Sequence, residues 1–531
     1  MTTSSQTPAT ATGAARVNAP DNKTQVIWGL DDRPPFAAAL TLAIQHVLTM
    51  FGSTVAVPLI FGPLLWPIPA DATAELSASL EPLQMANTAE LVSSVMLCSG
   101  VATLLQATFG SRLPIIQGVS FSFLAAFFAI VARVHDAAPI DWNAAGEAGS
   151  SQASLDAIAR WQASGAQGMQ TIAGAVILGG VVEATVGFTG LMGWLRRYLS
   201  PVVIGPVIML IGLALYQVGA PVAASDWYAS GATIALIMGF SLVLSRRYRI
   251  FKLFPTLSAI VLVVSACYAL GRAGALAPGD AAFVDASAYE SAPWVRFNRA
   301  LLPWGSPTFT LSAFVAVLAG YLASMIESFG DYHACKNVAG AGDPTPQEIS
   351  RGIGFEGIGC ALTGLLGGFS STSYSENIGL VGLTRVGSRY VVQIGGALLV
   401  LLGLFGKFGA LAAAIPKPVV GGLYCALFGL IAAVGVRQFA RADLDSDRNL
   451  FIGGFALFMG LSVPFYFSQF GQGAADVAWM PELARDVVVA LGSTGMAVAA
   501  LLGLALDNII PGTREERGLA PGVLVPEGGD L

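Results

Sequence analysis

Long apolar stretches alternate with short polar segments along almost the whole chain. A helix needs about 20 apolar residues to cross a bilayer, and most of the fourteen stretches approach that length. The first seven lie near residues 36–60, 89–109, 113–133, 169–190, 198–218, 229–245 and 255–271. The second seven lie near residues 309–334, 349–367, 374–386, 388–406, 411–435, 449–468 and 486–507. The pattern therefore predicts an all-α polytopic membrane protein with fourteen transmembrane segments in two groups of seven.

Two of these stretches, the third and the tenth, begin with small polar residues and become apolar only later. The third opens with residues 117–123, Gln-Gly-Val-Ser-Phe-Ser-Phe, and the tenth with residues 375–382, Ser-Glu-Asn-Ile-Gly-Leu-Val-Gly. They occupy matching positions in their groups of seven, a pattern typical of inverted-repeat transporters whose binding site lies at broken helices. A weaker similarity between residues 51–53 and 329–331 also supports the repeat. The sequence thus predicts a ligand site between broken segments 3 and 10.

The composition agrees with a membrane protein and excludes several other classes. Of the 531 residues, 54% are hydrophobic and 11% are charged, whereas soluble domains carry about 25% charged residues. The five cysteines form no CxxC pair, and three histidines are too few for a multi-histidine metal centre. We therefore expect no cofactor, no metal, no nucleic-acid partner and no enzymatic activity.

Basic residues predict the orientation of the segments. They are more frequent in the loops on one side of the predicted membrane, for example at residues 246–252. Because positively charged loops stay in the cytoplasm, both termini are expected there, in a multi-pass protein of the cell (plasma or inner) membrane. Residues 1–32 and 508–531 are expected to form cytoplasmic tails. Three long external loops are expected only to connect segments: 62–88, 134–168 and 273–308.

The eighth stretch carries two carboxylates, Glu327 and Asp331. A spacing of four places them on one face of a helix, and they repel each other when both are ionised. In a poorly hydrated site one of them is expected to hold a proton at neutral pH, as a proton carrier requires. The alternative is a helix-end pair that faces cytoplasmic water near Lys336, and Asp331 fits this alternative better than Glu327.

Glu376 and Asn377 begin the tenth stretch. A charge at the bilayer centre costs roughly 2.5–3.5 kcal/mol on insertion scales, so Glu376 is expected to face a ligand cavity. Its carboxylate can accept from ring N–H groups, while free N–H groups at a helix start can donate to ring carbonyls. The alternative for Glu376 is a helix-capping acid. Asn377 is expected to tie the two broken helices together rather than to contact the ligand.

Other polar or aromatic positions admit two interpretations each. Phe121, between two serines at the third stretch, could stack on a planar ligand or pack in the core. His46 is a functional candidate because ionisable residues within membranes usually are, or a hydrogen-bonded strut between helices. Gly379 permits close backbone approach to a ligand, whereas Gly382 is expected to serve helix packing.

These residues carry a family resemblance. Residues 376–385, Glu-Asn-Ile-Gly-Leu-Val-Gly-Leu-Thr-Arg, resemble the signature motif of the nucleobase–ascorbate transporters, also called the nucleobase:cation symporter-2 or xanthine/uracil permease family. Residues 45–58 resemble the first helix of that family, and residues 327–331 resemble its eighth. The similarity covers about residues 33–507.

The resemblance implies two inverted repeats of seven segments, with short strand-like pieces at the breaks of segments 3 and 10. Segments 1–4 and 8–11 would form a core domain, and segments 5–7 and 12–14 a gate domain. The implied core parts are residues 33–190 and 309–410, and the implied gate parts are residues 191–308 and 411–507. Members are typically homodimers that move the core against the gate in an elevator-like fashion.

Residue roles follow from the same motif match. The implied substrate-binding residues are Phe121, Glu327, Tyr374, Ser375 and Glu376, with Tyr374 and Ser375 contributing backbone contacts. The implied residues for proton coupling or site support are His46, Asp331, Asn377 and Thr384.

The resemblance gives two indications about the substrate. An acid at position 376 is similar to uracil permeases, whereas purine carriers usually have Gln there and ascorbate carriers Pro. Uracil permeases, however, tend to show Glu-His-x-Gly-His in segment eight, and residues 327–331 and 386–389 are closer to the xanthine/urate and vertebrate branch. We therefore expect proton-coupled symport of uracil or a related pyrimidine, with xanthine or uric acid as the alternative.

Two more distant alternatives are less consistent with the sequence. An anion transporter of the sulfate/bicarbonate type would share the architecture, but two acids at the site would repel an anionic substrate. A membrane enzyme or receptor lacks support, because the sequence shows no metal cluster, nucleophile–base pair or sizeable soluble domain. Sodium coupling is less expected than proton coupling, because no carbonyl cage for sodium is evident.

Overall fold

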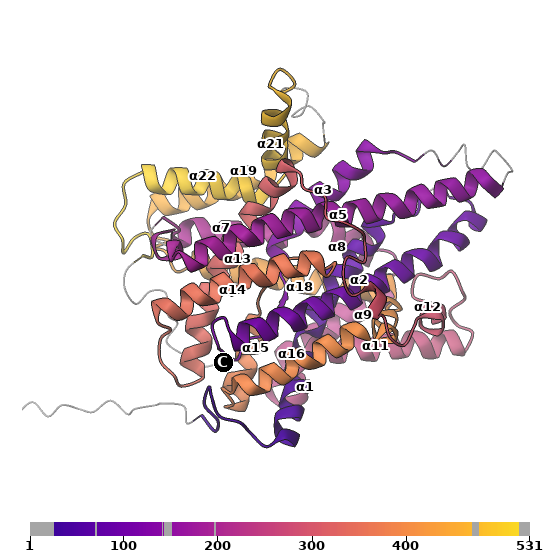
Figure 1. Ribbon diagram of the computed structural model, residues 1–531, viewed down its shortest axis with the longest axis horizontal. Coiled ribbons are helices and arrows are strands. Elements are labelled where there is room, and N and C mark those ends of the chain that lie inside the picture. Colours follow the sequence, from indigo (N-terminus) through magenta and orange to yellow (C-terminus); the bar gives the residue numbers. More distant parts are fainter. Residues whose placement is uncertain are drawn as a thin grey trace, which may run out of the picture.

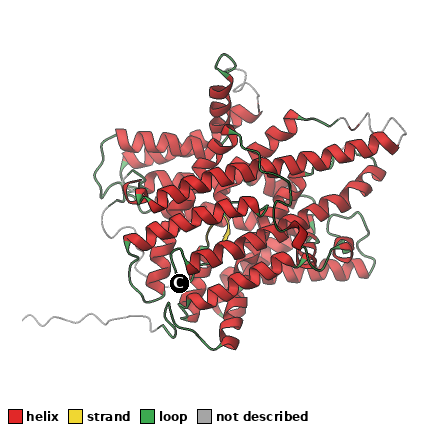
Figure 2. Cartoon of the chain, viewed as in Figure 1, coloured by secondary structure: helices red, strands yellow, loops and turns green. Residues whose placement is uncertain are grey.

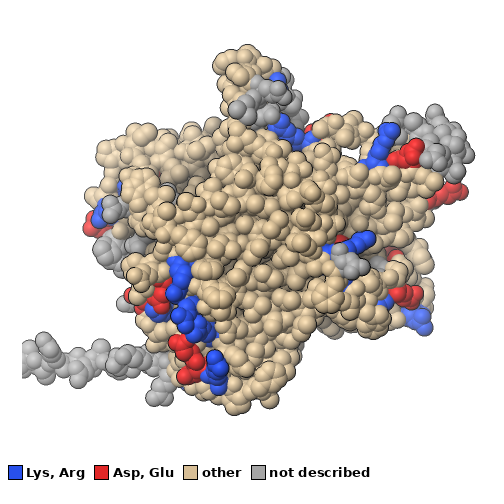
Figure 3. All heavy atoms as spheres, viewed as in Figure 1, with Lys and Arg blue, Asp and Glu red and all other residues tan. Residues whose placement is uncertain are grey.

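A computed structural model describes residues 26–69, 72–140, 142, 151–195, 198–469 and 477–519, and it is mostly helical (Figure 1). Within that part of the chain, nine helices are long and apolar enough to cross a membrane. The number is ten if α16 (Arg389–Leu404) and α17 (Gly406–Ala413), bent by 79°, form one span. Figure 3 shows a broad face without Lys, Arg, Asp or Glu, with the charged side chains near its edges. The chain is therefore a multi-pass membrane protein.

The remaining elements follow in chain order. Those of the first half are α1 (Phe36–Leu65), α2 (Ala74–Thr108), β1 (Gln117–Val119), η1 (Phe121–Phe123), α3 (Leu124–Ala137), α5 (Ser151–Phe188), α6 (Leu191–Leu195), α7 (Pro201–Ala214), α8 (Tyr216–Ala223), α9 (Trp227–Met238), η2 (Gly239–Val243), η3 (Leu244–Arg246), α10 (Arg249–Leu253) and α11 (Pro255–Arg272). Those of the second half are α12 (Ser287–Ser291), η4 (Phe297–Arg299), α13 (Leu311–Val338), α14 (Pro346–Leu365), β2 (Ser371–Ser373), α15 (Ser375–Thr384), α18 (Lys417–Phe439), α19 (Asp447–Gln469), α21 (Glu482–Gly492) and α22 (Gly495–Ile509).

The three predicted connecting loops contain helix, which corrects the sequence analysis. α2 begins at Ala74 and α5 at Ser151, so part of the predicted loops is helical, and the third loop contains α12 and η4. The start of α2 is stabilised because the Thr73 hydroxyl accepts from the Leu76 N–H at 3.3 Å. Hydropathy identifies only the apolar part of such a helix, whereas good helix formers such as Ala, Glu and Leu extend it beyond that part.

Two further boundaries differ from the prediction. The last apolar stretch is divided between α21 and α22 at residues 493–494, and the expected start of the twelfth segment at residue 411 falls inside α17. α18 instead begins at Lys417, directly after Pro416. Proline lacks a backbone N–H and therefore weakens the continuation of a preceding helix, whereas it is tolerated at a helix start. The helix breaks before Lys417 and at residues 493–494 lie within continuous apolar stretches, so hydropathy alone does not locate them.

Short strands lie at the breaks of segments 3 and 10, as predicted. β1 and β2 pair antiparallel with Gly118 opposite Thr372, and they lie in the interior of the helical body (Figure 2). β1 leads into η1 and α3, and β2 leads into α15. The starts of both half-helices are therefore fixed at one strand pair.

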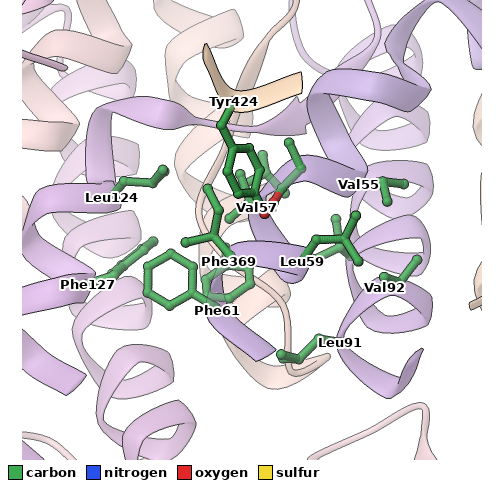
Figure 4. Close-up of a cluster of buried hydrophobic side chains, with 14 of the residues drawn as sticks. Val55, Val57, Leu59, Phe61, Leu91, Val92, Leu124, Phe127, Phe369 and Tyr424 are labelled. Atoms are coloured by element: carbon green, nitrogen blue, oxygen red, sulfur yellow. Dashed lines mark hydrogen bonds between the residues drawn. The ribbon is translucent and has the colours of Figure 1, made fainter. Parts of the chain in front are cut away.

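Aromatic side chains fix this strand pair against α1 and α3. Phe61 of α1, Phe127 of α3 and Phe369, just before β2, have ring centroids 5.0–6.0 Å apart. Figure 4 shows these rings converging, with Tyr424 of α18 above them. The Tyr424 hydroxyl donates to the Ala56 carbonyl oxygen at 3.3 Å. Burial of such rings contributes strongly to stability, so the breaks lie in a well-packed core.

Candidate functional site

Two acids on neighbouring helices form the centre of the candidate site. Glu327 lies in the middle of α13, and Glu376 lies in the first turn of α15. Both side chains are exposed although their helices lie within the bundle, and their charges are close enough to interact. Glu327 and Glu376, with the exposed residues beside them, are called the acid site below.

Open space adjoins the acid site on both helices. Gly330 on α13 and Gly379 on α15 are exposed, and a Cβ added to either would meet no heavy atom within 4 Å. The exposed Ser375 lies on the same end of α15. The two helices thus present accessible polar surface beside unfilled volume, which is what a small ligand needs.

Ser53 of α1 orients the Glu376 carboxylate. Its hydroxyl donates to Glu376 Oε1 at 3.0 Å, and Ser53 itself is buried. This bond occupies one lone pair of the carboxylate and fixes its direction. From the sequence, residues 51–53 indicate only a repeat, and the bond from Ser53 to Glu376 is not predicted, because side-chain contacts between distant helices are not visible in hydropathy.

Asp331 faces the start of α15 rather than water beyond the helix end. It is only 8% exposed, and its Oδ1 accepts from the Ser375 hydroxyl at 2.8 Å. Its Oδ2 has no hydrogen-bond partner among the described residues. The alternative of a solvated helix-end acid is therefore wrong, and Asp331 joins α13 to α15 next to the acid site.

His46 and Asn377 form a buried connection between α1 and α15. The Asn377 side-chain amide nitrogen lies 3.0 Å from the His46 carbonyl oxygen and 3.0 Å from His46 Nδ1. Because the carbonyl can only accept, the amide nitrogen must face it, and Nδ1 is then the acceptor in the second bond. Asn377 thus ties the tenth segment to the first, not to the third as expected.

Tyr374 closes the site at the strand pair. Its hydroxyl donates to the Val119 carbonyl oxygen at 2.9 Å and accepts from the Thr54 hydroxyl at 3.2 Å. Its backbone N–H donates to the Ile116 carbonyl oxygen at 3.0 Å, so this N–H is already used. The first N–H groups of a helix lack intrahelical acceptors, and at α15 these belong to Ser375 and Glu376.

Phe121 and Thr384 lie at the margins of this arrangement. Phe121 is half-buried in η1 and packs against a cluster that includes Ala323 of α13 and Val207 of α7. Thr384, at the end of α15, donates to the Leu380 carbonyl oxygen of its own helix at 2.8 Å. Thr384 therefore supports α15 itself, while the cluster that Phe121 packs against includes Ala323, one helical turn before Glu327.

Sequence analysis missed two buried acids behind the acid site, Glu356 of α14 and Glu183 of α5, which are 2% and 0% exposed. Both lie in predicted apolar stretches, where any ionisable residue is a functional candidate, so the same rule that selected His46 could have identified them. Glu356 accepts hydrogen bonds from hydroxyls that flank the acid site on α13 and β2.

The acid site offers carboxylate acceptors from Glu327 and Glu376 and backbone donors at the start of α15. A planar heterocycle with ring N–H donors and carbonyl acceptors matches this set. Among the described residues, no group of three or more His, Cys, Asp or Glu side chains is arranged to hold a metal ion.

Comparisons with known proteins agree with this picture. The xanthine/uracil permease model, described as "Permease family", matches residues 37–469. Solute carrier family 23 member 1 of Rattus norvegicus is 36% identical, covering 94% of this chain and 82% of its own. Nucleobase-ascorbate transporter 2 of Arabidopsis thaliana is 32% identical, covering 92% of this chain and 90% of its own.

A solved structure shares the fold at much lower sequence identity. The transmembrane domain of a cyanobacterium bicarbonate transporter, BicA, aligns with a TM-score of 0.50 at 15% identity. The alignment covers 88% of this chain and 99% of that domain. The likeness shows a transporter-type membrane fold.

Proposed function

Because this chain belongs to the nucleobase–ascorbate transporter family, we propose that it imports uracil or a related pyrimidine together with protons. The chain is a membrane transporter and not an enzyme. The observation that carries the proposal is the pairing of Glu327 and Glu376 beside open space at Gly330 and Gly379.

The charges at the acid site favour a neutral substrate. Ascorbate and urate are anions at neutral pH, and two carboxylates would repel them. Uracil is neutral and presents two ring N–H groups and two carbonyl oxygens. The Glu376 carboxylate, oriented by Ser53, can accept from one N–H and Glu327 from another, and the start of α15 can donate to a carbonyl. Xanthine, with a similar edge, is the second candidate.

Proton coupling follows from the same acids. Two neighbouring carboxylates are stabilised when they hold one proton between them. The remaining acceptor oxygens of Glu327 can then bind a ligand N–H. Binding of substrate and proton at one location links their movement. In this account Asp331 and His46 support the coupling, Asn377 holds α15 to α1, and Phe121 flanks the base.

The transport movement is proposed at the level of whole segments. Fourteen segments form two inverted repeats, and segments 1–4 and 8–11 carry the site as a core that moves against a gate of segments 5–7 and 12–14. The transporter acts as a homodimer in the cell membrane with both termini in the cytoplasm. The similarity to a bicarbonate transporter domain supports the architecture, and the two acids disfavour its anionic substrate.

The test is competition of labelled uracil uptake in cells that lack their own nucleobase carriers. Unlabelled uracil, xanthine, uric acid and ascorbate serve as competitors, with and without a proton uncoupler. We expect saturable uptake that the uncoupler abolishes and only pyrimidines block. Direct uptake of xanthine or urate without uracil uptake would contradict the pyrimidine assignment, and uptake that follows a sodium gradient would contradict proton coupling.

A further inference from the structure

The helices α5 and α14 pack unusually closely behind the acid site. Their contact is made by glycines: a Cβ added to Gly180 would lie 2.6 Å from the Gly357 carbonyl oxygen, and one added to Gly187 would overlap Gly354. Glu183 is three residues after Gly180 and four before Gly187, so it lies on the same face of α5. Figure 1 shows α5, α13 and α14 as neighbouring helices. Glu183 is thus held at a contact that excludes water.

The carboxyl group of Glu183 is buried without a hydrogen-bond partner in the described part of the chain. The residue is 0% exposed, and neither carboxyl oxygen has a hydrogen-bond partner among the described residues. The Cys360 thiol lies beside it, but this thiol donates to the Ser371 carbonyl oxygen, with sulfur and oxygen 3.2 Å apart. An ionised carboxyl without donors is costly in such a place, whereas the protonated form is tolerated.

Glu356, which faces Glu183 from α14, has the opposite environment. Its Oε1 accepts from the hydroxyls of Ser328 at 2.6 Å and Thr372 at 3.2 Å. The Ser324 hydroxyl lies 3.4 Å from the same oxygen but donates at 2.9 Å to Thr372 Oγ1, so it supports Glu356 through Thr372. Its Oε2 accepts from the Tyr332 hydroxyl at 2.6 Å. These donors match the acceptor capacity of an ionised carboxylate. The neighbouring acids therefore differ: the surroundings of Glu356 stabilise an ionised carboxylate, whereas those of Glu183 favour a protonated carboxylic acid.

No basic side chain is among the groups that face this pair in the described part of the chain. The titratable groups that face Glu183 or Glu356 are Cys360 of α14 and Tyr321, Glu327, Asp331 and Tyr332 of α13. Without a nearby cation, removing the proton from Glu183 would leave two adjacent negative charges. A single proton shared within the pair is the arrangement that the packing accommodates.

We propose that Glu183 and Glu356 form a second proton-binding site behind the acid site, at which Glu183 takes up and releases one proton in each transport cycle. This inference rests on the proposed proton-coupled transport. When the site is open to the outside, a hydronium ion on that side gives up a proton, which passes by way of Glu356 and forms an O–H bond at the buried Glu183. When the site is open to the cytoplasm, this O–H bond breaks and the proton returns by way of Glu356. The proton leaves to water on that side, and no bond of the substrate changes.

A physical link joins the second site to the first. Ser328 donates to Glu356 from α13, the helix that carries Glu327. Ser324 of the same helix donates to Thr372, which donates to Glu356 from β2, two residues before Tyr374. Any displacement of α13 or β2 on substrate binding changes the donors around Glu356, and thereby its ability to pass a proton to Glu183. Proton occupancy and substrate occupancy are coupled through these hydroxyls.

The experiment uses the purified full-length protein in proteoliposomes. Protons moved per uracil are obtained from the reversal potential, and the pH profile of uptake is recorded in parallel. The variants are Glu183→Gln, the conservative Glu183→Asp, and Glu81→Gln as a matched control at an exposed position of α2. Uracil counterflow exchange, which needs no net proton movement, reports whether each variant still folds and binds substrate.

We expect Glu183→Gln to move about one proton fewer per uracil, with a flattened pH profile, or to retain exchange while losing accumulation. Glu183→Asp and Glu81→Gln should keep the wild-type ratio. If Glu183→Gln kept the wild-type ratio of protons to uracil and the wild-type pH profile, the second proton-binding site would be overturned. Loss of uracil exchange in both Glu183 variants would also overturn it, because it would indicate a structural role for Glu183. Failure of the wild-type protein to couple uracil to protons would instead overturn the proposed function.

Discussion

At the scale of single residues, the environment of each carboxyl determines what it can do. Glu327 and Glu376 are exposed beside open space, while Asp331, Glu356 and Glu183 are buried behind them. Only the first pair can contact a ligand directly. The buried acids can act only through the positions and protons of the groups around them.

Glu327→Gln should abolish uracil uptake while the protein still reaches the membrane. The substitution preserves side-chain size but removes the charge and the exchangeable proton. Uptake is measured in cells together with surface biotinylation, and Glu81→Gln is the control for a carboxyl-to-amide change away from the site. Near-normal uptake by Glu327→Gln would remove Glu327 from the mechanism.

Ser53→Ala should weaken uracil binding without loss of the fold. A hydrogen bond to a charged group contributes about 1.5–3 kcal/mol, so KM should rise roughly 10- to 100-fold while the maximal rate changes less. Ser79→Ala, which removes an exposed hydroxyl on α2, is the control. An unchanged KM would mean that the Ser53–Glu376 bond does not position the carboxylate for substrate.

At the scale of secondary-structure elements, the strand pair decides whether a site exists. β1 and β2 fix the starts of α3 and α15, and Tyr374 packs its ring on Gly118. Gly118 has no side chain, so the ring can lie directly against the strand. The backbone groups of α15 are aimed by this packing and by the Asn377–His46 tie.

Gly118→Ala should therefore disrupt the site although residue 118 touches no ligand. The added Cβ would overlap the Tyr374 ring, and overpacking of a tight core costs about 1–3 kcal/mol. We expect a lower Tm and loss of uptake. Gly231→Ala in α9, where an added Cβ meets nothing within 4 Å, should leave uptake intact. Equal Tm values for Gly118→Ala and wild type would contradict the packing argument.

The elements also show where sequence patterns suffice. Small polar residues at the starts of segments 3 and 10 correctly indicated two breaks, because unpaired backbone in a membrane protein is tolerated only where it is buried in protein or lines a cavity. The full lengths of α2 and α5 were missed, because their polar ends resemble loops in hydropathy.

For the site, motifs located Glu327 and Glu376 but not their partners. Which helix face meets which is determined by tertiary packing, so neither the Ser53–Glu376 bond nor the Asn377–His46 tie could be derived from the sequence. The proximity of Glu183 to Glu356 depends on glycines in two helices that are far apart in sequence.

At the scale of the whole molecule, orientation in the membrane follows from the distribution of basic residues. The loop at residues 246–252 is expected in the cytoplasm and the segment after α11 outside. Arg247 and Ala275 are exposed residues in these two regions, and each is replaced by cysteine in a separate variant. A membrane-impermeant maleimide should label Ala275→Cys in intact cells and Arg247→Cys only after permeabilisation. The reverse pattern would invert the proposed topology.

In the proposed transport cycle, a proton gradient drives a neutral nucleobase through the acid site. The most direct measurement is uracil accumulation in proteoliposomes of purified protein under an imposed pH gradient, alkaline inside, with sodium absent. The account predicts uracil accumulation above its external concentration by wild type, collapse of that accumulation on adding an uncoupler, and none by Glu327→Gln. Equal accumulation with and without the pH gradient, or by Glu327→Gln, would contradict it.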